Sequence, residues 1–261
     1  MIVTDKFVFV HFPRTGGTFI TDVITRFFPS ARGIGYHLPR SLLPNEYSHL
    51  PVLGAVRNPW EFYVSWYYHV WPRDAATPLH SWLSENGKHQ FEGAIRNALN
   101  LGVDNKRLDA LIEKLPDTVD YRTRNIPNIT KDSMRKARGT GVGYYTFRFN
   151  QLFGNADEVF FCRLETLRQD LVSFFEGIGA ATDELRDYLL CSDKKNISEH
   201  VHYSAYYTPE LAELVSIRDA LMIERFGYVF ERPSSVDKGE PKFEQVRSSY
   251  FRHRPRPSGS V

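Results

Sequence analysis

Cysteine is scarce in this chain of 261 residues, which contains only Cys162 and Cys191. Two cysteines exclude a framework of several disulfides, and they are too far apart to form a CxxC pair for zinc. Cys162 lies in the apolar segment VFFC, so we expect a buried and unreactive thiol there. His200 and His202 lie without further ligands at metal-binding spacing, so the sequence predicts no metal site.

A strong charge of one sign is also missing. Lys and Arg number 33 against 31 Asp and Glu, which leaves a formal net charge of +2. This balance argues against nucleic acid or a membrane surface as a partner, so recognition of an anion must be local. The basic segment 121–141 is interpreted as solvated loop, with docking of an acidic acceptor as the alternative.

Long hydrophobic runs are absent as well. No segment has the roughly 20 consecutive apolar residues of a membrane span. Asp5 and Lys6 leave the first residues with too short an apolar run for a signal-peptide core, so we expect a cytoplasmic protein. The composition fits one α/β domain over residues 1–232, followed by a tail rich in Pro, Ser and basic residues over 233–261.

The most informative segment is 7–27, FVFVHFPRTGGTFITDVITRF. Its apolar run 7–12 has the length of a buried strand, and the apolar spacing from Ile20 onwards predicts a helix. Between them, Gly16 and Gly17 permit a sharp turn and a close approach of the backbone to a ligand. Such a turn directs free N–H groups and the positive end of the helix dipole to one point, which favours phosphate or sulfate. For this motif alone, a turn that binds nothing is the alternative.

A second motif lies at 52–68, VLGAVRNPWEFYVSWYY. The predicted strand 52–56 places Arg57 at its carboxyl end, where open parallel sheets bind ligands. Asn58 before a proline predicts the start of a helix, and Ser65 lies two turns into it. A guanidinium and a hydroxyl in these positions can both reach one phosphate.

The glycine turn departs from the Walker A pattern GxxxxGK[ST], because Gly17 stands where that pattern requires Lys. This departure counts against a P-loop nucleotide kinase. The kinase stays as an alternative, as does a non-catalytic nucleotide-binding module.

Together the two motifs resemble the sulfotransferases that use 3′-phosphoadenosine 5′-phosphosulfate (PAPS). PRTGGT at 13–18 is similar to the P-[KR]-x-G-[GT]-T loop that holds the 5′-phosphosulfate in that family. Arg57 and Ser65 match the Arg and Ser, eight residues apart, that hold the 3′-phosphate. The sequences of the two motifs most resemble those of the glycan O-sulfotransferase branch, in which H-x-x-K-T-G-G-T is followed by R-[DN]-P. Arg14 stands in place of the usual Lys, which substitutes a planar fork for a point charge.

The resemblance implies a fold, a donor site and a reaction. The fold is α/β: a P-loop-like three-layer architecture whose central, mostly parallel sheet is flanked by helices. The implied donor-binding residues are Arg14, Thr15, Gly16, Gly17, Thr18, Arg57 and Ser65, with Phe19 against the adenine. The sulfuryl group of PAPS would move by in-line displacement to a hydroxyl of a carbohydrate or glycoconjugate, without a metal. A polysaccharide, a glycolipid, a secondary metabolite and a tyrosyl peptide all stay open as acceptors.

Two residues receive catalytic roles from the resemblance. Arg14 would neutralise charge on the leaving phosphate. His37, in Gly35-Tyr36-His37 at the end of a short possible strand, matches a Gly-x-His that supplies the family's general base. Imidazole suits a base near neutrality, with an acidic limb expected near pH 6 to 7, and a surface histidine is the alternative reading. The next candidates for the base are Glu61, His69 and His202.

The rest of the chain alternates between helices and one further strand. Apolar periodicity predicts helices within 78–115 and 143–154, and EVFFCRLE at 158–165 is typical of a buried strand. Thr166 would cap the next helix in a capping box with Gln169, and one long helix would run from Thr208-Pro209 to Gly227. The aromatic stretch 60–82 is interpreted mainly as core, in which Trp66 and Tyr67 cannot both face inward.

Overall fold

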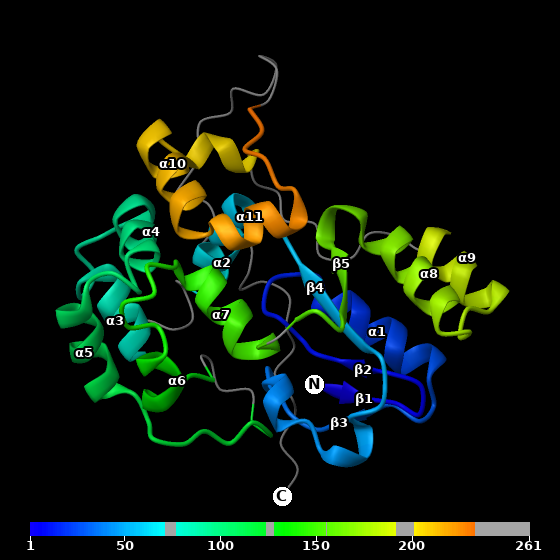
Figure 1. Ribbon diagram of the computed structural model, residues 1–261. Helices are drawn as coiled ribbons and strands as arrows, with labels where there is room; N and C mark the ends of the chain where they lie inside the picture. The colour runs from blue at the N-terminus through cyan, green and yellow to red at the C-terminus, as the bar shows by residue number, and fades with distance from the viewer. Residues whose placement is uncertain (71–76, 124–127, 155, 192–200, 233–261) are drawn as a thin grey trace, which may run out of the picture.

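The computed structural model describes residues 1–70, 77–123, 128–154, 156–191 and 201–232. The predicted tail 233–261, Trp71 and His200 lie outside these described residues. The described chain is α/β, with helices on both faces of one five-stranded sheet (Figure 1).

The sheet is mixed, and its strand order is β3-β1-β2-β4-β5. The strands are β1 Ile2–Val3, β2 Val8–Phe9, β3 Arg32–Gly33, β4 Val52–Val56 and β5 Val159–Arg163. Strands β2, β4 and β5 are parallel neighbours, whereas β1 runs antiparallel to both β2 and β3. The carboxyl ends of the three parallel strands therefore meet at one edge of the sheet, and both predicted motifs begin at that edge.

Eleven α-helices are described. They are α1 Gly17–Phe27, α2 Pro59–Val70, α3 Pro78–Ser84, α4 Phe91–Leu99, α5 Asn105–Lys114, α6 Lys131–Arg135, α7 Tyr144–Phe153, α8 Leu167–Gly177, α9 Asp183–Cys191, α10 Pro209–Arg218 and α11 Ala220–Phe226. Among the described residues, no helix is long and apolar enough to cross a membrane.

Two apolar cores lie on opposite faces of the sheet because alternate strand residues point to opposite sides. Phe7 and Phe9 belong to the core under α1, α8 and α9, while Val8 and Val10 belong to the larger core under α2, α4 and α7. Figure 1 shows these two groups of helices on either side of the strands. The strand predicted over 7–12 is therefore limited to Val8–Phe9, but the apolar side chains of the whole segment are buried as expected.

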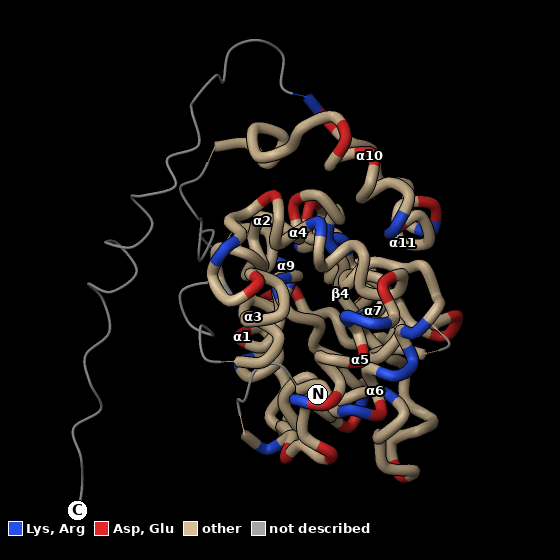
Figure 2. Tube along the Cα trace, turned by 90° about the vertical axis from the view of Figure 1, so that its left-hand side faces the viewer, with Lys and Arg blue, Asp and Glu red and all other residues tan. Residues whose placement is uncertain are grey.

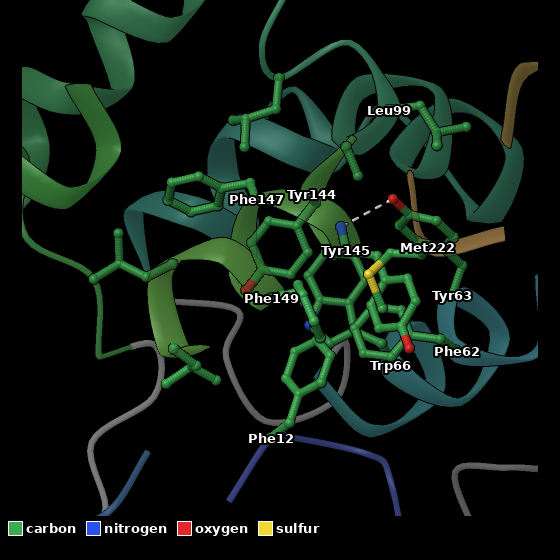
Figure 3. Packing of buried hydrophobic residues seen from close by; sticks show 14 of the residues in the cluster. Phe12, Phe62, Tyr63, Trp66, Leu99, Tyr144, Tyr145, Phe147, Phe149 and Met222 are labelled. Carbon is green, nitrogen blue, oxygen red and sulfur yellow. Dashed lines mark hydrogen bonds between the residues drawn. The ribbon is translucent and has the colours of Figure 1, made fainter. Parts of the chain in front are cut away.

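The larger core is aromatic, and α2 is covered on two sides. Trp66 stacks on Tyr144 of α7 with ring centroids 4.6 Å apart, whereas Tyr67 meets Phe91 of α4 edge-on at 5.2 Å. Both side chains are buried, so the expectation that they could not both face inward is wrong. A helix enclosed between two others can bury residues on neighbouring faces. Figure 3 shows Trp66 and Tyr144 in this core, next to Tyr145.

Tertiary hydrogen bonds account for two corrections to the predicted helices. The long helix from Thr208 breaks into α10 and α11 at Asp219, whose fully buried carboxylate accepts hydrogen bonds from Tyr63 and Thr146. Thr166 does not form a capping box, because its hydroxyl donates to Asp170 Oδ2 at 2.8 Å. The predicted caps at Asn58 and Thr208 are both present.

Two smaller corrections concern exposure. Strand β5 is an edge strand, and Phe160 on it is exposed, so the segment is only half-buried. In the basic segment 121–141, Arg122, Lys131 and Arg138 form ion pairs with Asp120, Asp117 and Asp109. Basic and acidic residues are interspersed along the chain, as Figure 2 shows, which agrees with the small net charge. Cys162 is buried as predicted, and burial raises the pKa of its thiol.

Candidate functional site

The turn at 13–18 connects β2 to α1 and has an unusual backbone. Arg14 and Gly16 both have left-handed conformations, with φ of +65° and +85°, and Gly16 is the N-cap of α1. A non-glycine residue in this region is uncommon and concentrates at functional sites, so Arg14 is held there by its surroundings. Phe19 N–H already donates to Gly16 O at 3.0 Å, which leaves the earlier N–H groups of the turn as those a ligand could use.

Both glycines of the turn are required by packing. A Cβ on Gly17 would lie 1.9 Å from Nε2 of His11, and a Cβ on Gly16 would lie 2.7 Å from Leu167 Cδ2. The sequence suggested close approach of a ligand as the reason for two glycines. The structure adds a second reason: the His11 ring occupies the space beside Gly17.

The remaining residues of the turn differ in what their side chains can do. Thr15 is fully buried, and its hydroxyl donates to Phe12 O at 2.9 Å, so it shapes the turn. Thr18 is exposed in the first turn of α1. Phe19 lies parallel to the Tyr188 ring of α9 at 6.5 Å, with the Arg168 guanidinium 5.0 Å from its centroid. A partly exposed aromatic face beside an arginine suits a flat base.

The second motif is anchored through its backbone. Arg57 N–H donates to Tyr145 Oη at 3.0 Å, and that hydroxyl donates to Arg57 O at 2.7 Å. The Tyr145 ring stacks on both Phe12 and Phe62, with ring centroids 5.2 Å and 4.3 Å away. Asn58 Oδ1 then accepts from Trp60 N–H at 3.0 Å and begins α2. The position of Arg57 is therefore fixed by the core shown in Figure 3.

The structure brings the two motifs together. The Arg14 guanidinium donates to Ser65 Oγ from Nε at 3.1 Å and from Nη2 at 2.9 Å. Arg57 Nη1 donates to Arg14 O at 3.3 Å, and its Nη2 donates to Glu61 Oε1. Arg57 Nε is buried without a hydrogen-bond partner. The guanidiniums of Arg14 and Arg57 and the hydroxyl of Ser65 therefore lie together at the N-terminus of α1. The N–H donor at Arg57 Nε has no partner, so the group suits an anion.

His37 lies next to this turn rather than at the end of a strand. Strand β3 ends at Gly33, and His37 occupies a left-handed turn with φ of +48°. Its Nδ1 is 2.9 Å from His11 O, and its ring centroid is 4.7 Å from that of His11. A carbonyl can only accept, so Nδ1 carries the hydrogen and Nε2 of the neutral ring keeps its lone pair. That tautomer can act as a base through Nε2.

Burial affects both histidines. It lowers the pKa of His37 well below 6.5, and the electrostatic effects of His11, when protonated, and of the Arg148 guanidinium act in the same direction. It also lowers the pKa of His11 to about 3. Both rings are consequently neutral at physiological pH, which is the state a general base requires.

A buried network holds the turn that carries His37. Tyr36 N–H donates to Tyr121 O at 2.6 Å, and the Asn128 amide donates to Tyr36 O. Arg148 and Gln151 of α7 in turn donate to Asn128 O, at 3.4 Å and 3.2 Å. The sequence analysis did not assign His11, Asn128 or Arg148 to the site, although His11 is the first residue of the motif HFPRTGGT. The contacts of Asn128 and Arg148 are tertiary and leave no local pattern.

A cavity of about 470 Å³ lies beside Arg57 at the carboxyl ends of β4 and β5. It is lined by Asn58, Glu61, Arg163, Glu165, Thr166, Val201, His202, Tyr203, Gly227, Tyr228, Val229 and Glu231. Glu165, also unforeseen, accepts from Asn58 N–H at 2.8 Å, and burial raises the pKa of its carboxyl. Of the reserve candidates for the base, Glu61 and His202 line this cavity, and His69 lies near the end of α2.

The residues that the structure describes contain no group of three or more His, Cys, Asp or Glu able to hold a metal ion. In comparisons with known proteins, no family model, no curated protein and no solved structure matches the chain.

Proposed function

We propose that this protein is a PAPS-dependent O-sulfotransferase with a P-loop-like donor site. The observation that carries the proposal is the convergence of Arg14, Arg57 and Ser65 on the glycine turn. The His37 ring lies 4.7 Å from the ring of His11, which packs beside Gly17 of that turn. Cationic groups at a helix N-terminus explain an anion site, and a second anion site beside the first suits a nucleotide with phosphates at both 5′ and 3′ positions.

The donor fits the residues present. Arg57 has an unused buried Nε, and the turn offers N–H groups at the start of α1. In this assignment 13–18 holds the 5′-phosphosulfate, Arg57 and Ser65 hold the 3′-phosphate, and Phe19 stacks on the adenine. The donor supplies an activated sulfuryl group and a good leaving phosphate.

The chain's residues then have separate tasks. His37 Nε2 takes the proton of the acceptor hydroxyl as that oxygen bonds to sulfur and the bond from sulfur to the bridging phosphate oxygen breaks. Arg14 stabilises the negative charge that develops on the departing phosphate oxygen. The products are a sulfate ester and 3′-phosphoadenosine 5′-phosphate, and the proton rests on His37 until water removes it. The acceptor class proposed is a carbohydrate or glycoconjugate hydroxyl.

A calorimetric titration with 3′-phosphoadenosine 5′-phosphate, AMP and ATP tests the nucleotide assignment. We expect tight binding of the bisphosphate and weaker binding of the other two. Preference for ATP with Mg²⁺ would favour the nucleotide kinase instead. Incubation with labelled PAPS and a panel of polysaccharides, glycolipids, phenols and tyrosyl peptides then tests the reaction. Nucleotide binding without transfer to any acceptor would indicate the non-catalytic module.

A further inference from the structure

Arg57 already has an anionic partner inside the proposed donor site. Its Nη2 donates to the Glu61 carboxylate, one helical turn along α2. Its Nη1 donates to Arg14 O at 3.3 Å, and its Nε has no hydrogen-bond partner. The Arg57 side chain is 9% exposed and the Glu61 side chain 28%, so this pair is shielded from solvent more than an ordinary surface pair.

Glu61 also faces the place where a ligand would enter. It lines the cavity of about 470 Å³ together with Glu165 and Glu231, two further carboxylates. Arg163 is the only arginine or lysine among the residues that line this described cavity. A phosphate arriving at Arg57 therefore meets a guanidinium that is engaged and a carboxylate that repels it.

We propose that Glu61 is a built-in competitor of the 3′-phosphate for Arg57 and so sets the affinity of the site for bisphosphate nucleotides. This inference rests on the proposed function. A phosphate that binds the guanidinium through both Nε and Nη2 needs the Nη2 donor that Glu61 now holds, so it must displace Glu61. When 3′-phosphoadenosine 5′-phosphate leaves, the Glu61 carboxylate pairs with Arg57 Nη2 again. This ion pair stabilises the nucleotide-free site, so release of the nucleotide becomes easier.

Glu61→Gln tests the inference, because the amide keeps the shape of the carboxylate but loses its charge. We expect calorimetry to show about five- to tenfold tighter binding of 3′-phosphoadenosine 5′-phosphate than in the wild type. AMP lacks the 3′-phosphate, so its affinity should change by less than about twofold. Glu92→Gln is the matched control, since Glu92 pairs with Arg96 at the same spacing on α4, 2.7 Å apart, and should leave both affinities unchanged.

A double-mutant cycle separates competition at Arg57 from a general loss of negative charge. In an Arg57→Ala background, Glu61→Gln should no longer improve the affinity for the bisphosphate. Glu61→Asp, which keeps the charge on a shorter side chain, should give an intermediate affinity and serves as a second variant if Glu61→Gln folds poorly.

The outcomes distinguish the inference from the function beneath it. If the wild type binds none of the nucleotides, the proposed function fails and the inference with it. If the wild type binds the bisphosphate but Glu61→Gln binds it equally or more weakly, the inference alone is wrong and Glu61 instead holds Arg57 in its binding position. An equal gain for AMP and for the bisphosphate would likewise overturn competition for the 3′-phosphate.

Discussion

Arg14 and Ser65, 51 residues apart, are joined by two hydrogen bonds from one guanidinium to one hydroxyl. Arg14 belongs to the glycine turn and Ser65 to the second motif, so this contact ties the proposed sites of the 5′ and 3′ groups together. Ser65 Oγ accepts from Arg14 and keeps its own O–H to donate to a phosphate, so Arg14 orients the hydroxyl that would hold the 3′-phosphate. The two residues therefore cannot be treated as independent when variants are interpreted.

Arg14→Ala should reduce kcat by about 10² to 10³, more than it weakens nucleotide binding, because charge on the leaving oxygen develops only as the bond to sulfur breaks. Arg14→Lys keeps the charge and should retain much of the activity. Steady-state kinetics with varied PAPS, together with calorimetry, separates the two effects. Arg186→Ala on α9, which removes an exposed cation paired with Glu176 and Asp183, should change neither value. Unaltered turnover in Arg14→Ala would rule out the leaving-group role.

Arg57→Ala should cost 3′-phosphoadenosine 5′-phosphate about 1.5 to 3 kcal/mol of binding free energy, which corresponds to roughly 10- to 150-fold in affinity. AMP should bind this variant as it binds the wild type, since it lacks the 3′-phosphate. Ser65→Ala should show the same discrimination with a smaller loss. Ser216→Ala on α10, whose hydroxyl bonds only within its own helix at Ala212 O, is the control. Equal losses for both nucleotides would contradict the assignment of the 3′-phosphate.

Local patterns in the sequence were sufficient to predict several elements. The apolar spacing before and after Gly16 and the Asn58-Pro59 cap depend on neighbours within a few residues, and the structure contains α1 and α2 where they were expected. The alternation of Phe7 and Val8 between two cores also follows from the period of a strand. The α/β class therefore follows from local patterns, whereas the arrangement of helices on both faces of the sheet was expected only from the family resemblance.

Features that depend on distant partners could not be predicted. The helix break at Asp219 results from hydrogen bonds with Tyr63 and Thr146, which lie 156 and 73 residues away. The strained turn at His37 is held by Asn128, 92 residues from the Tyr36 carbonyl it contacts. By contrast, the pairing of Arg57 with Glu61 follows the i, i+4 spacing of a helix and was available in the sequence.

Asp219 should make the stability of the protein depend on pH. Burial raises the pKa of its carboxyl to about 6 from 3.8, so the fold favours the protonated form. Its contribution to stability is fully present below about pH 3.8 and is lost as the pH rises through about 6. Between pH 5 and 7 the wild type should lose about 1.4 kcal/mol of unfolding free energy relative to Asp219→Asn. Urea unfolding of both proteins at each pH measures the difference, and identical pH dependences would contradict the shift.

His37→Ala should bind nucleotide normally and lose about 10² to 10⁴ in turnover, because the acceptor hydroxyl then has no base. Burial lowers the pKa of His37, so the neutral, active form persists to lower pH than in a free imidazole. The acidic limb of the wild-type rate profile should therefore lie below pH 6.5, and not at pH 6 to 7 as an unperturbed histidine would give. His49→Ala removes an exposed histidine and should leave turnover and profile unchanged. If His37→Ala keeps near-normal turnover with the same acidic limb, the base lies elsewhere, and His202 in the wall of the cavity is the residue to change next.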